Sequence, residues 1–258
     1  MIAVVDYQKG NLKSVERGLI AAGVEALITA DASEIAKADA IVLPGVGAFA
    51  DAAATMCELG QMEAIRDRVR AGVPFLGICL GEHLMFEHGV EGAPEGNPAC
   101  GLGLLPGTVV AMPRCDAQGK TFKVPHVGWN TIEMPSCNGG AAVPPCGGVG
   151  GNAVLKQSSL RSENAGGAFP DSTPQPGSDL AFACPLFNGI APGEYFYFTH
   201  SFIAPTGSHT IAETTHSTRF TSAVQYGDRA FGVQFHPEKS SDAGARVLAN
   251  FVAIVARG

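Results

Sequence analysis

The stretch 73–87 constrains the fold more than any other part of this chain. It begins as an apolar run typical of a buried strand, and glycines stand two residues before and two residues after Cys79. Leu84 and Met85 follow Leu80 at helical spacing, so the sequence predicts a strand that turns sharply into a helix. Gly-x-nucleophile-x-Gly at such a turn is a nucleophile elbow, which exposes its central side chain above the sheet. A buried packing role is the alternative for this cysteine, but a thiol at a helix N-terminus is favoured as the reactive thiolate.

Length and charge narrow the possible functions. The chain has 258 residues, 46% of them hydrophobic, which is enough for one large α/β domain over 1–258. Its net charge of −7 argues against general binding to nucleic acid or to a membrane surface, because no basic excess exists to neutralise phosphates. No apolar run reaches the roughly 18 residues of a membrane helix, and Asp6 interrupts the first run, so no signal peptide is expected.

The cysteines point to a reducing environment. There are seven, at positions 57, 79, 100, 115, 137, 146 and 184, and none forms a C-x-x-C pair. This spacing fits neither a zinc site nor a disulfide framework, so no metal site is expected. We expect a cytoplasmic protein, with a plastid location after removal of a transit peptide as the alternative.

Strands and helices alternate along the chain. Apolar runs predict strands at 2–5, 26–28, 40–43, 108–111, 195–198, 210–212, 221–224 and 230–235. Helical periodicity predicts helices at 12–22, around 62–69 and at 247–255. This alternation predicts an α/β fold with a doubly wound, mostly parallel sheet flanked by helices and with functional loops at the strand C-termini.

A glycine-rich loop follows the third predicted strand. The segment 44–50 formally matches a dinucleotide-binding G-x-G-x-x-A pattern. The acidic residue that such a site needs after the next strand is missing, because the region near Asp67 has the periodicity of an amphipathic helix. The other use of such a loop is to offer backbone N–H groups to a developing negative charge beside Cys79.

Two further segments stand out. The segment 124–130 holds the only tryptophan, Trp129, next to His126, Gly128 and Asn130, and we expect it at a turn, with a packed indole as the structural interpretation. From about 135 to 180 the chain is rich in Gly, Pro and Ser and lacks periodicity, which predicts a surface insertion without a core or a chemical role.

A second sequence feature with catalytic potential, a His–Glu pair, lies near the C-terminus. The last predicted strand runs into His236, Pro237 and Glu238. In an extended segment, residues i and i+2 face the same side, so Glu238 is expected to hold one imidazole nitrogen of His236. The other nitrogen is then free to take a proton from Cys79, although a surface His–Glu pair is the commoner occurrence.

Together, the segments 77–81 and 234–238 resemble the Cys-His-Glu triad of class I glutamine amidotransferases, which have a flavodoxin-like fold. Within that group, the segments 44–49 and 125–130 resemble the glutaminase subunits of imidazole glycerol phosphate synthase, an enzyme of histidine biosynthesis. The resemblance implies hydrolysis of glutamine to glutamate and ammonia without a cofactor. It also implies a heterodimer with a (β/α)8 cyclase subunit, which uses the ammonia to make imidazole glycerol phosphate and AICAR.

The resemblance also assigns roles to individual residues. It implies Cys79 as nucleophile, His236 as general base and acid, and Glu238 as the residue that orients His236. It implies that the oxyanion and glutamine are bound by Gly45, Val46, Gly47, Leu80, His83, His200, Ser201 and Phe202. It implies that Asn11, Trp129, Tyr197 and Lys239 face the partner.

One residue departs from the family pattern. Four residues after the nucleophile the family usually has Gln, and here this position is His83, whose imidazole can replace only part of an amide's donor and acceptor pattern. His83 and Glu87 are spaced i, i+4, as metal ligands on a helix can be, but without a third ligand a local helix pair is expected. The competing functions are the glutaminase subunit of anthranilate or pyridoxal phosphate synthase, or a catalytically impaired subunit that only binds a partner.

Overall fold

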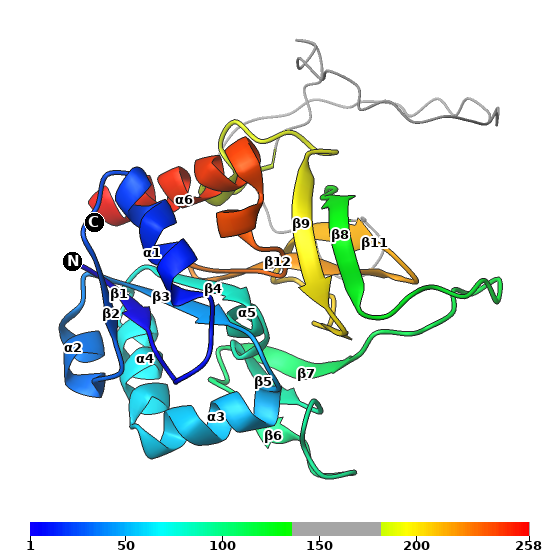
Figure 1. Cartoon of the computed structure of the whole chain (residues 1–258), viewed down its shortest axis with the longest axis horizontal. Coiled ribbons are helices and arrows are strands. Elements are labelled where there is room, and N and C mark those ends of the chain that lie inside the picture. The colour runs from blue at the N-terminus through cyan, green and yellow to red at the C-terminus, as the bar shows by residue number, and fades with distance from the viewer. Residues whose placement is uncertain (136–181, 258) are drawn as a thin grey trace.

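The computed structural model describes residues 1–135 and 182–257 (Figure 1). The predicted insertion at about 135–180 therefore lies almost entirely outside the described residues. Strands β1 (Ile2–Val5), β3 (Ala40–Gly45) and β4 (Phe75–Cys79) are buried along their whole length. Burial on both faces explains why these strands form unbroken apolar runs in the sequence rather than alternating ones.

These strands belong to a seven-stranded sheet with the order β11-β12-β13-β4-β3-β1-β2. Its other members are β2 (Ala26–Thr29), β11 (Thr210–Thr215), β12 (Arg219–Tyr226) and β13 (Ala230–Val233). The five strands from β13 to β2 are parallel, and β11 and β12 add an antiparallel edge. The structure thus confirms the predicted mostly parallel α/β sheet.

Helices cover both faces of this sheet (Figure 1). On one face lie α1 (Leu12–Ala21) and α6 (Ser241–Ala256), and on the other lie α2 (Ala32–Lys37), α3 (Phe49–Glu58) and α4 (Gln61–Arg70). Each layer has its own apolar cluster against the sheet, with Val15 and Phe251 in one and Phe49 and Ile65 in the other. The predicted helical periodicities therefore mark the faces that pack on the sheet.

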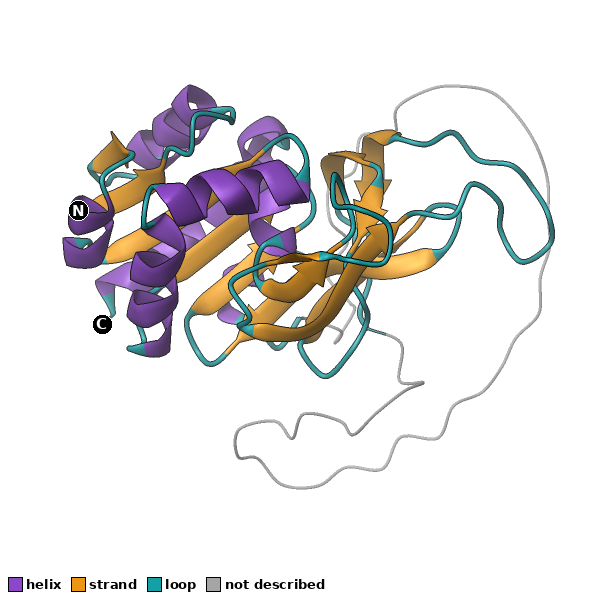
Figure 2. Ribbon diagram, turned by 90° about the horizontal axis from the view of Figure 1, so that it is seen from below, coloured by secondary structure: helices purple, strands orange, loops and turns teal. Residues whose placement is uncertain are grey.

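Two smaller sheets lie beside the large one (Figure 2). The four-stranded sheet consists of β10 (Phe202–Ile203), β7 (Leu105–Ala111), β5 (Phe86–Gly89) and β6 (Ala99–Cys100). The two-stranded sheet, called here the ribbon, pairs β8 (His126–Thr131) with β9 (Tyr195–His200). Two 3₁₀ turns, η1 (Pro185–Phe187) and η2 (Pro237–Lys239), adjoin α6. No helix in the described part combines the length and apolar character needed to cross a membrane.

The structure corrects two local predictions. The helix after Cys79, α5 (Leu80–His83), has a single turn, and Glu87 already lies on β5, so His83 and Glu87 are not a helical pair. The segment around Trp129 is not a turn but strand β8, and the indole is 52% exposed rather than packed. Pairing with β9, far along the chain, sets this local conformation, and sequence periodicity does not report such pairing.

Candidate functional site

The site is built on the elbow between β4 and α5. Cys79 adopts φ +54° and ψ −106°, a conformation rare for a residue with a side chain and one that costs roughly 1–3 kcal/mol. The chain passes so close to itself here that a Cβ on Gly77 would lie 2.5 Å from the carbonyl oxygen of Gly81, and one on Gly81 would collide with the carbonyl oxygen of Leu43. Backbone packing therefore fixes the turn that carries the thiol, as the sequence predicts for a nucleophile elbow.

His236 and Glu238 form the second part of the site. The Nδ1 atom of His236 lies 2.9 Å from Oε1 of Glu238, and both side chains are almost completely buried. Glu238 belongs to the 3₁₀ turn η2, so a tight turn brings the two side chains together rather than the extended segment predicted from the sequence. The other ring nitrogen, Nε2, is buried and has no hydrogen-bond partner among the described residues.

The charge state of His236 follows from its neighbours. Burial lowers its pKa, but the sulfur of Cys79 and the carboxylate of Glu238 favour the imidazolium and together raise the pKa to about 9. At neutral pH the ring is therefore protonated beside a thiol that can lose its proton. An imidazolium next to a nucleophilic sulfur is the resting state of many thiol enzymes.

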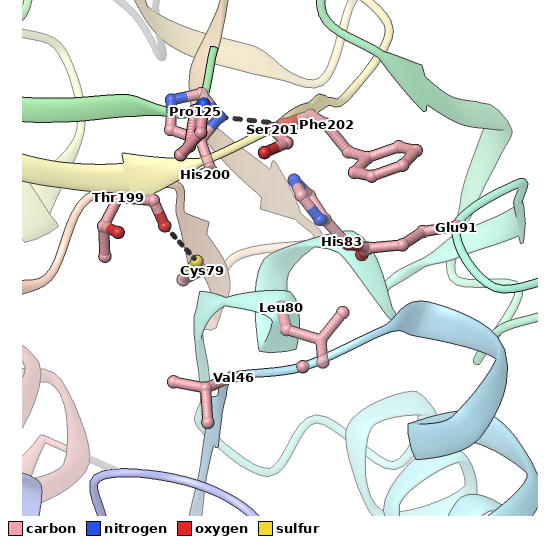
Figure 3. A pocket seen from close by; sticks show the side chains of 11 residues that line it. Val46, Cys79, Leu80, His83, Glu91, Pro125, Thr199, His200, Ser201 and Phe202 are labelled. Carbon is pink, nitrogen blue, oxygen red and sulfur yellow. Dashed lines mark hydrogen bonds between the residues drawn. The ribbon is translucent and has the colours of Figure 1, made fainter.

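A pocket opens in front of Cys79 between two walls (Figure 3). The strand-end wall consists of Val46, Gly47, Cys79, Leu80 and His83. The ribbon wall consists of Pro125, Thr199, His200, Ser201 and Phe202, and Glu91 lies beside His83 at the edge. The thiol of Cys79 lies 3.8 Å from the carbonyl oxygen of Thr199, which places the thiol at the junction of the two walls.

The glycine-rich loop lies next to Cys79 because the two strands that end there, β3 and β4, are adjacent in the sheet. Gly45 is the register partner of Cys79 across β3 and β4. Val46 and Gly47 follow directly and line the pocket, with Gly47 at φ +104°. The structure thus places the three residues expected at the oxyanion beside the thiol.

His83 lines the pocket, and a buried side chain that does not line the pocket holds its ring by a hydrogen bond. Its Nε2 atom lies 2.7 Å from Oε1 of Gln234, and both side chains are buried. Burial lowers the pKa of His83 to about 4, although the bond to Gln234 opposes this. The imidazole is therefore neutral at physiological pH.

Both ring nitrogens of His200 are hydrogen-bonded within the protein. Its Nδ1 donates to the carbonyl oxygen of Phe202 at 2.8 Å, so its Nε2 accepts from Nδ1 of His126 at 3.0 Å. The side chain of Asn130 lies 3.3 Å from the remaining nitrogen of His126. Burial keeps the pKa values of both histidines low. His200 thus shapes the 200–202 segment and offers no free ring nitrogen to a ligand.

The residues expected at a partner surface lie outside the pocket. Trp129 and Tyr197 are cross-strand neighbours on the ribbon, with ring centroids 6.1 Å apart, and Nζ of Lys239 lies 5.9 Å from the Tyr197 ring. Asn11 precedes α1, which contacts the η2 turn that carries Lys239.

Sequence reasoning gave no role to two residues of the site, Glu91 and Gln234. Glu91 is the one acidic residue among those that line the pocket, and burial raises its pKa. Nothing in its local sequence distinguishes it from a surface acid. Gln234 donates from Nε2 to the sulfur of Cys79 at 3.7 Å. The position of Gln234 within the apolar run 230–235 could have indicated such a role, because a buried polar side chain needs hydrogen-bond partners.

The sequence model of the family described as "Glutamine amidotransferase class-I" matches residues 3–145 and 147–255. A crystal structure titled as that of a glutamine amidotransferase superposes with a TM-score of 0.60 at 16% identity and covers 99% of this chain and 100% of its own. The solved structure of PurLQS from Thermotoga maritima gives a TM-score of 0.57 at 14% identity and covers 99% of this chain and 97% of its own. The fold is therefore that of the class I amidotransferases.

Curated relatives narrow the family further. "Imidazole glycerol phosphate synthase subunit HisH" of Moorella thermoacetica is 38% identical over 256 residues, which are 98% of this chain and 95% of the relative. The protein of the same name from Rhodopirellula baltica is 37% identical, over 97% of this chain and 96% of the relative. This chain belongs to the HisH family of class I glutamine amidotransferases.

Proposed function

We propose that this chain is the glutaminase subunit of an imidazole glycerol phosphate synthase and supplies ammonia for histidine biosynthesis. The observation that carries the proposal is the buried His236–Glu238 pair beside a cysteine held in a nucleophile elbow. The names of the relatives support the choice of synthase, because each is called a subunit of imidazole glycerol phosphate synthase. The site supplies the chemistry.

In the first step, the Cys79 thiolate attacks the side-chain carbonyl carbon of glutamine and a C–S bond forms. The negative charge that develops on oxygen is stabilised by backbone N–H groups of the 45–47 loop and of Leu80. His236, protonated because its pKa is about 9, gives its proton to the departing nitrogen, and ammonia leaves.

In the second step, water cleaves the resulting glutamyl thioester. His236 is now neutral and accepts the proton of the attacking water, while Glu238 holds its Nδ1–H and stabilises the imidazolium that forms. The C–S bond breaks, glutamate is released and the Cys79–His236 pair returns to its resting charges. Both steps use only water and groups of this chain.

The pocket also suits the amino-acid end of glutamine. Glu91 offers a half-buried carboxylate to the α-ammonium group. Binding of a cation removes the unfavourable effect of burial on the ionised carboxylate. Ser201 and the backbone of the 200–202 segment face the same space and suit the α-carboxylate (Figure 3).

The ribbon suits a protein partner. Val127, Trp129 and Tyr195 are each more than half exposed, and Val127 and Tyr195 flank the Trp129–Tyr197 pair beside Lys239. Exposed aromatic residues next to a cation are typical of interface hot spots. We propose that this surface, with Asn11, binds the cyclase subunit, a (β/α)8 barrel that receives the ammonia.

The ribbon also adjoins the catalytic turn. The backbone N–H of His236 donates to the carbonyl oxygen of Tyr197, and the backbone N–H of Tyr197 donates to Oγ of Ser240. A partner that contacts Tyr197 therefore touches a strand bonded directly to the triad. The proposed compartment is the cytoplasm, where the free thiols of Cys57, Cys100 and Cys115 stay reduced.

The test is glutamate release from glutamine, measured with and without a histidine-pathway cyclase and the nucleotide substrate of that cyclase. Strong stimulation by both components is the expected result. Stimulation by the anthranilate or pyridoxal phosphate synthase partner instead would assign the chain to that synthase. Folded protein that releases no glutamate in any mixture would leave a subunit that only binds its partner.

A further inference from the structure

Gln234 connects His83 to the nucleophile. It follows β13, the strand adjacent to β4, and its backbone N–H donates to the carbonyl oxygen of Ser222. The side chain is completely buried and spans two polar neighbours: Nε2 lies 3.7 Å from the sulfur of Cys79, and Oε1 lies 2.7 Å from Nε2 of His83. The amide of Gln234 therefore links the thiol of Cys79 to a residue of the pocket wall.

The chemistry of the three groups fixes the direction of both bonds. The amide oxygen of Gln234 can only accept, so Nε2 of His83 carries the proton. The amide nitrogen then points its hydrogens at Cys79. The reversed amide would place its oxygen against the Cys79 thiolate, and two electron-rich atoms in contact disfavour that orientation when the thiol is ionised.

We propose that Gln234 is a positioning residue that stabilises the Cys79 thiolate through its amide N–H, and that His83 holds the amide in this orientation. His83 stands in the position where the family usually has Gln. It then acts on the nucleophile indirectly, through the side chain of Gln234. Its Nδ1 has no hydrogen-bond partner among the described residues and remains an acceptor toward the pocket. The consequence for turnover rests on the proposed function, but the effect on the sulfur does not.

The test is the pH dependence of Cys79 alkylation by iodoacetamide, followed by peptide-resolved mass spectrometry because other thiols also react. Gln234→Met removes the amide while keeping the side-chain volume. We expect the pH of half-maximal alkylation to rise by about one unit, the size of a lost hydrogen bond to an ionised group. Gln234→Glu, which turns an oxygen toward the sulfur, is expected to raise it at least as much and serves if the Met variant does not fold.

Two variants at position 83 test the orientation. His83→Phe removes the donor and is expected to raise the midpoint in the native background but to add nothing in the Gln234→Met background. His83→Gln keeps a donor that can reach Gln234 and is expected to leave the midpoint at its native value. Unchanged midpoints in the Gln234 variants would overturn the proposal, and additive effects of the two sites would overturn the part assigned to His83.

The same proteins are assayed for glutamate release with the cyclase subunit. Shifted alkylation midpoints together with no glutamate release in the native protein would refute the proposed function and support this inference. Normal glutamate release with unshifted alkylation midpoints would support the proposed function and refute this inference. The two ideas therefore fail separately.

Discussion

The two walls of the pocket are built in different ways. The strand-end wall stands on β3 and β4, which are buried on both faces and packed backbone against backbone at Gly77 and Gly81. The ribbon wall stands on two strands, of which β9 alternates between a buried face with Phe196, Phe198 and His200 and a more exposed face.

The difference separates two tasks. The nucleophile needs a fixed position and receives it from a surface that cannot move without disrupting the main sheet. Recognition of a partner needs exposure, and the ribbon supplies it close to the pocket, since Tyr197 faces outward two residues before Thr199, whose carbonyl contacts Cys79. The ribbon thus places an outer surface and an inner surface on the same short strands.

The largest effect is expected from Cys79→Ala on the strand-end wall. Loss of the nucleophile should reduce glutamine-dependent synthesis by the complex at least about 10³-fold. Ammonia-dependent synthesis should survive, because the partner and the ribbon are unchanged. Cys184→Ala, at a buried thiol outside the pocket, is the matched control and should retain both activities. Loss of both activities in Cys79→Ala would show that this residue is structural.

Glu238→Gln, on the η2 turn, should impair the acid–base role proposed for His236 without removing the nucleophile. The neutral amide no longer favours the imidazolium, so the pKa of His236 should fall from about 9. Because the proposed mechanism needs protonated His236 for ammonia to depart, the alkaline limb of the pH–rate profile should move to lower pH. We also expect kcat to fall about 10²-fold or more. Asp242→Asn, at an exposed carboxylate in the first turn of α6, is the control. An unmoved alkaline limb would contradict the assigned role of Glu238.

Trp129→Ala tests the ribbon wall. Truncation of a half-exposed aromatic anchor should weaken binding to the cyclase by roughly 30-fold, equivalent to about 2 kcal/mol. Alkylation of Cys79 in the isolated chain should stay unchanged, because the indole does not line the pocket. Titration calorimetry measures the first quantity. Leu27→Ala, an exposed apolar residue on the opposite edge of the main sheet, should bind like the native chain. Equal loss in both variants would remove the ribbon as the docking surface.

The smallest effect on catalysis and partner binding is expected from Glu82→Met, beneath the strand-end wall, which should change folding stability instead. Glu82 is fully buried among Gly232, Met85 and Val224, and neither carboxyl oxygen has a hydrogen-bond partner among the described residues. Burial raises its pKa well above the ordinary value. An apolar side chain of similar size should therefore stabilise the fold by roughly 1–3 kcal/mol.

The gain has a predictable pH dependence. The folded state binds the Glu82 proton more tightly than the unfolded state, so this residue costs stability as pH rises above its ordinary pKa. The advantage of Glu82→Met should grow from pH 4 to pH 8 in chemical unfolding. Glu82→Gln, which keeps unpartnered polar atoms, should gain less. A gain that shrinks with rising pH would contradict this account.

How far the sequence predicts the molecule depends on the range of the interactions involved. The buried strands 2–5 and 40–43 and the elbow at Cys79 follow from local composition, so periodicity finds them. The His236–Glu238 pair was predicted correctly but for the wrong reason, because a 3₁₀ turn rather than an extended strand brings the residues together. Trp129 was misplaced because β8 pairs with a strand beyond residue 190. Glu91 and the Gln234 bridge depend on tertiary contacts between separate elements.

The backbone packing at the elbow also has an evolutionary consequence. Positions 77 and 81 have no room for a Cβ, so almost every substitution there should be lost from a library selected for histidine prototrophy. Position 83 lies just beyond this constraint, at the end of α5, where the side chain no longer supports the turn. An exchange of amide for imidazole at that position can therefore accumulate while the nucleophile stays in place. Positions 77 and 81 are therefore restricted to glycine by backbone packing, whereas position 83 is restricted only to side chains that can donate to Gln234.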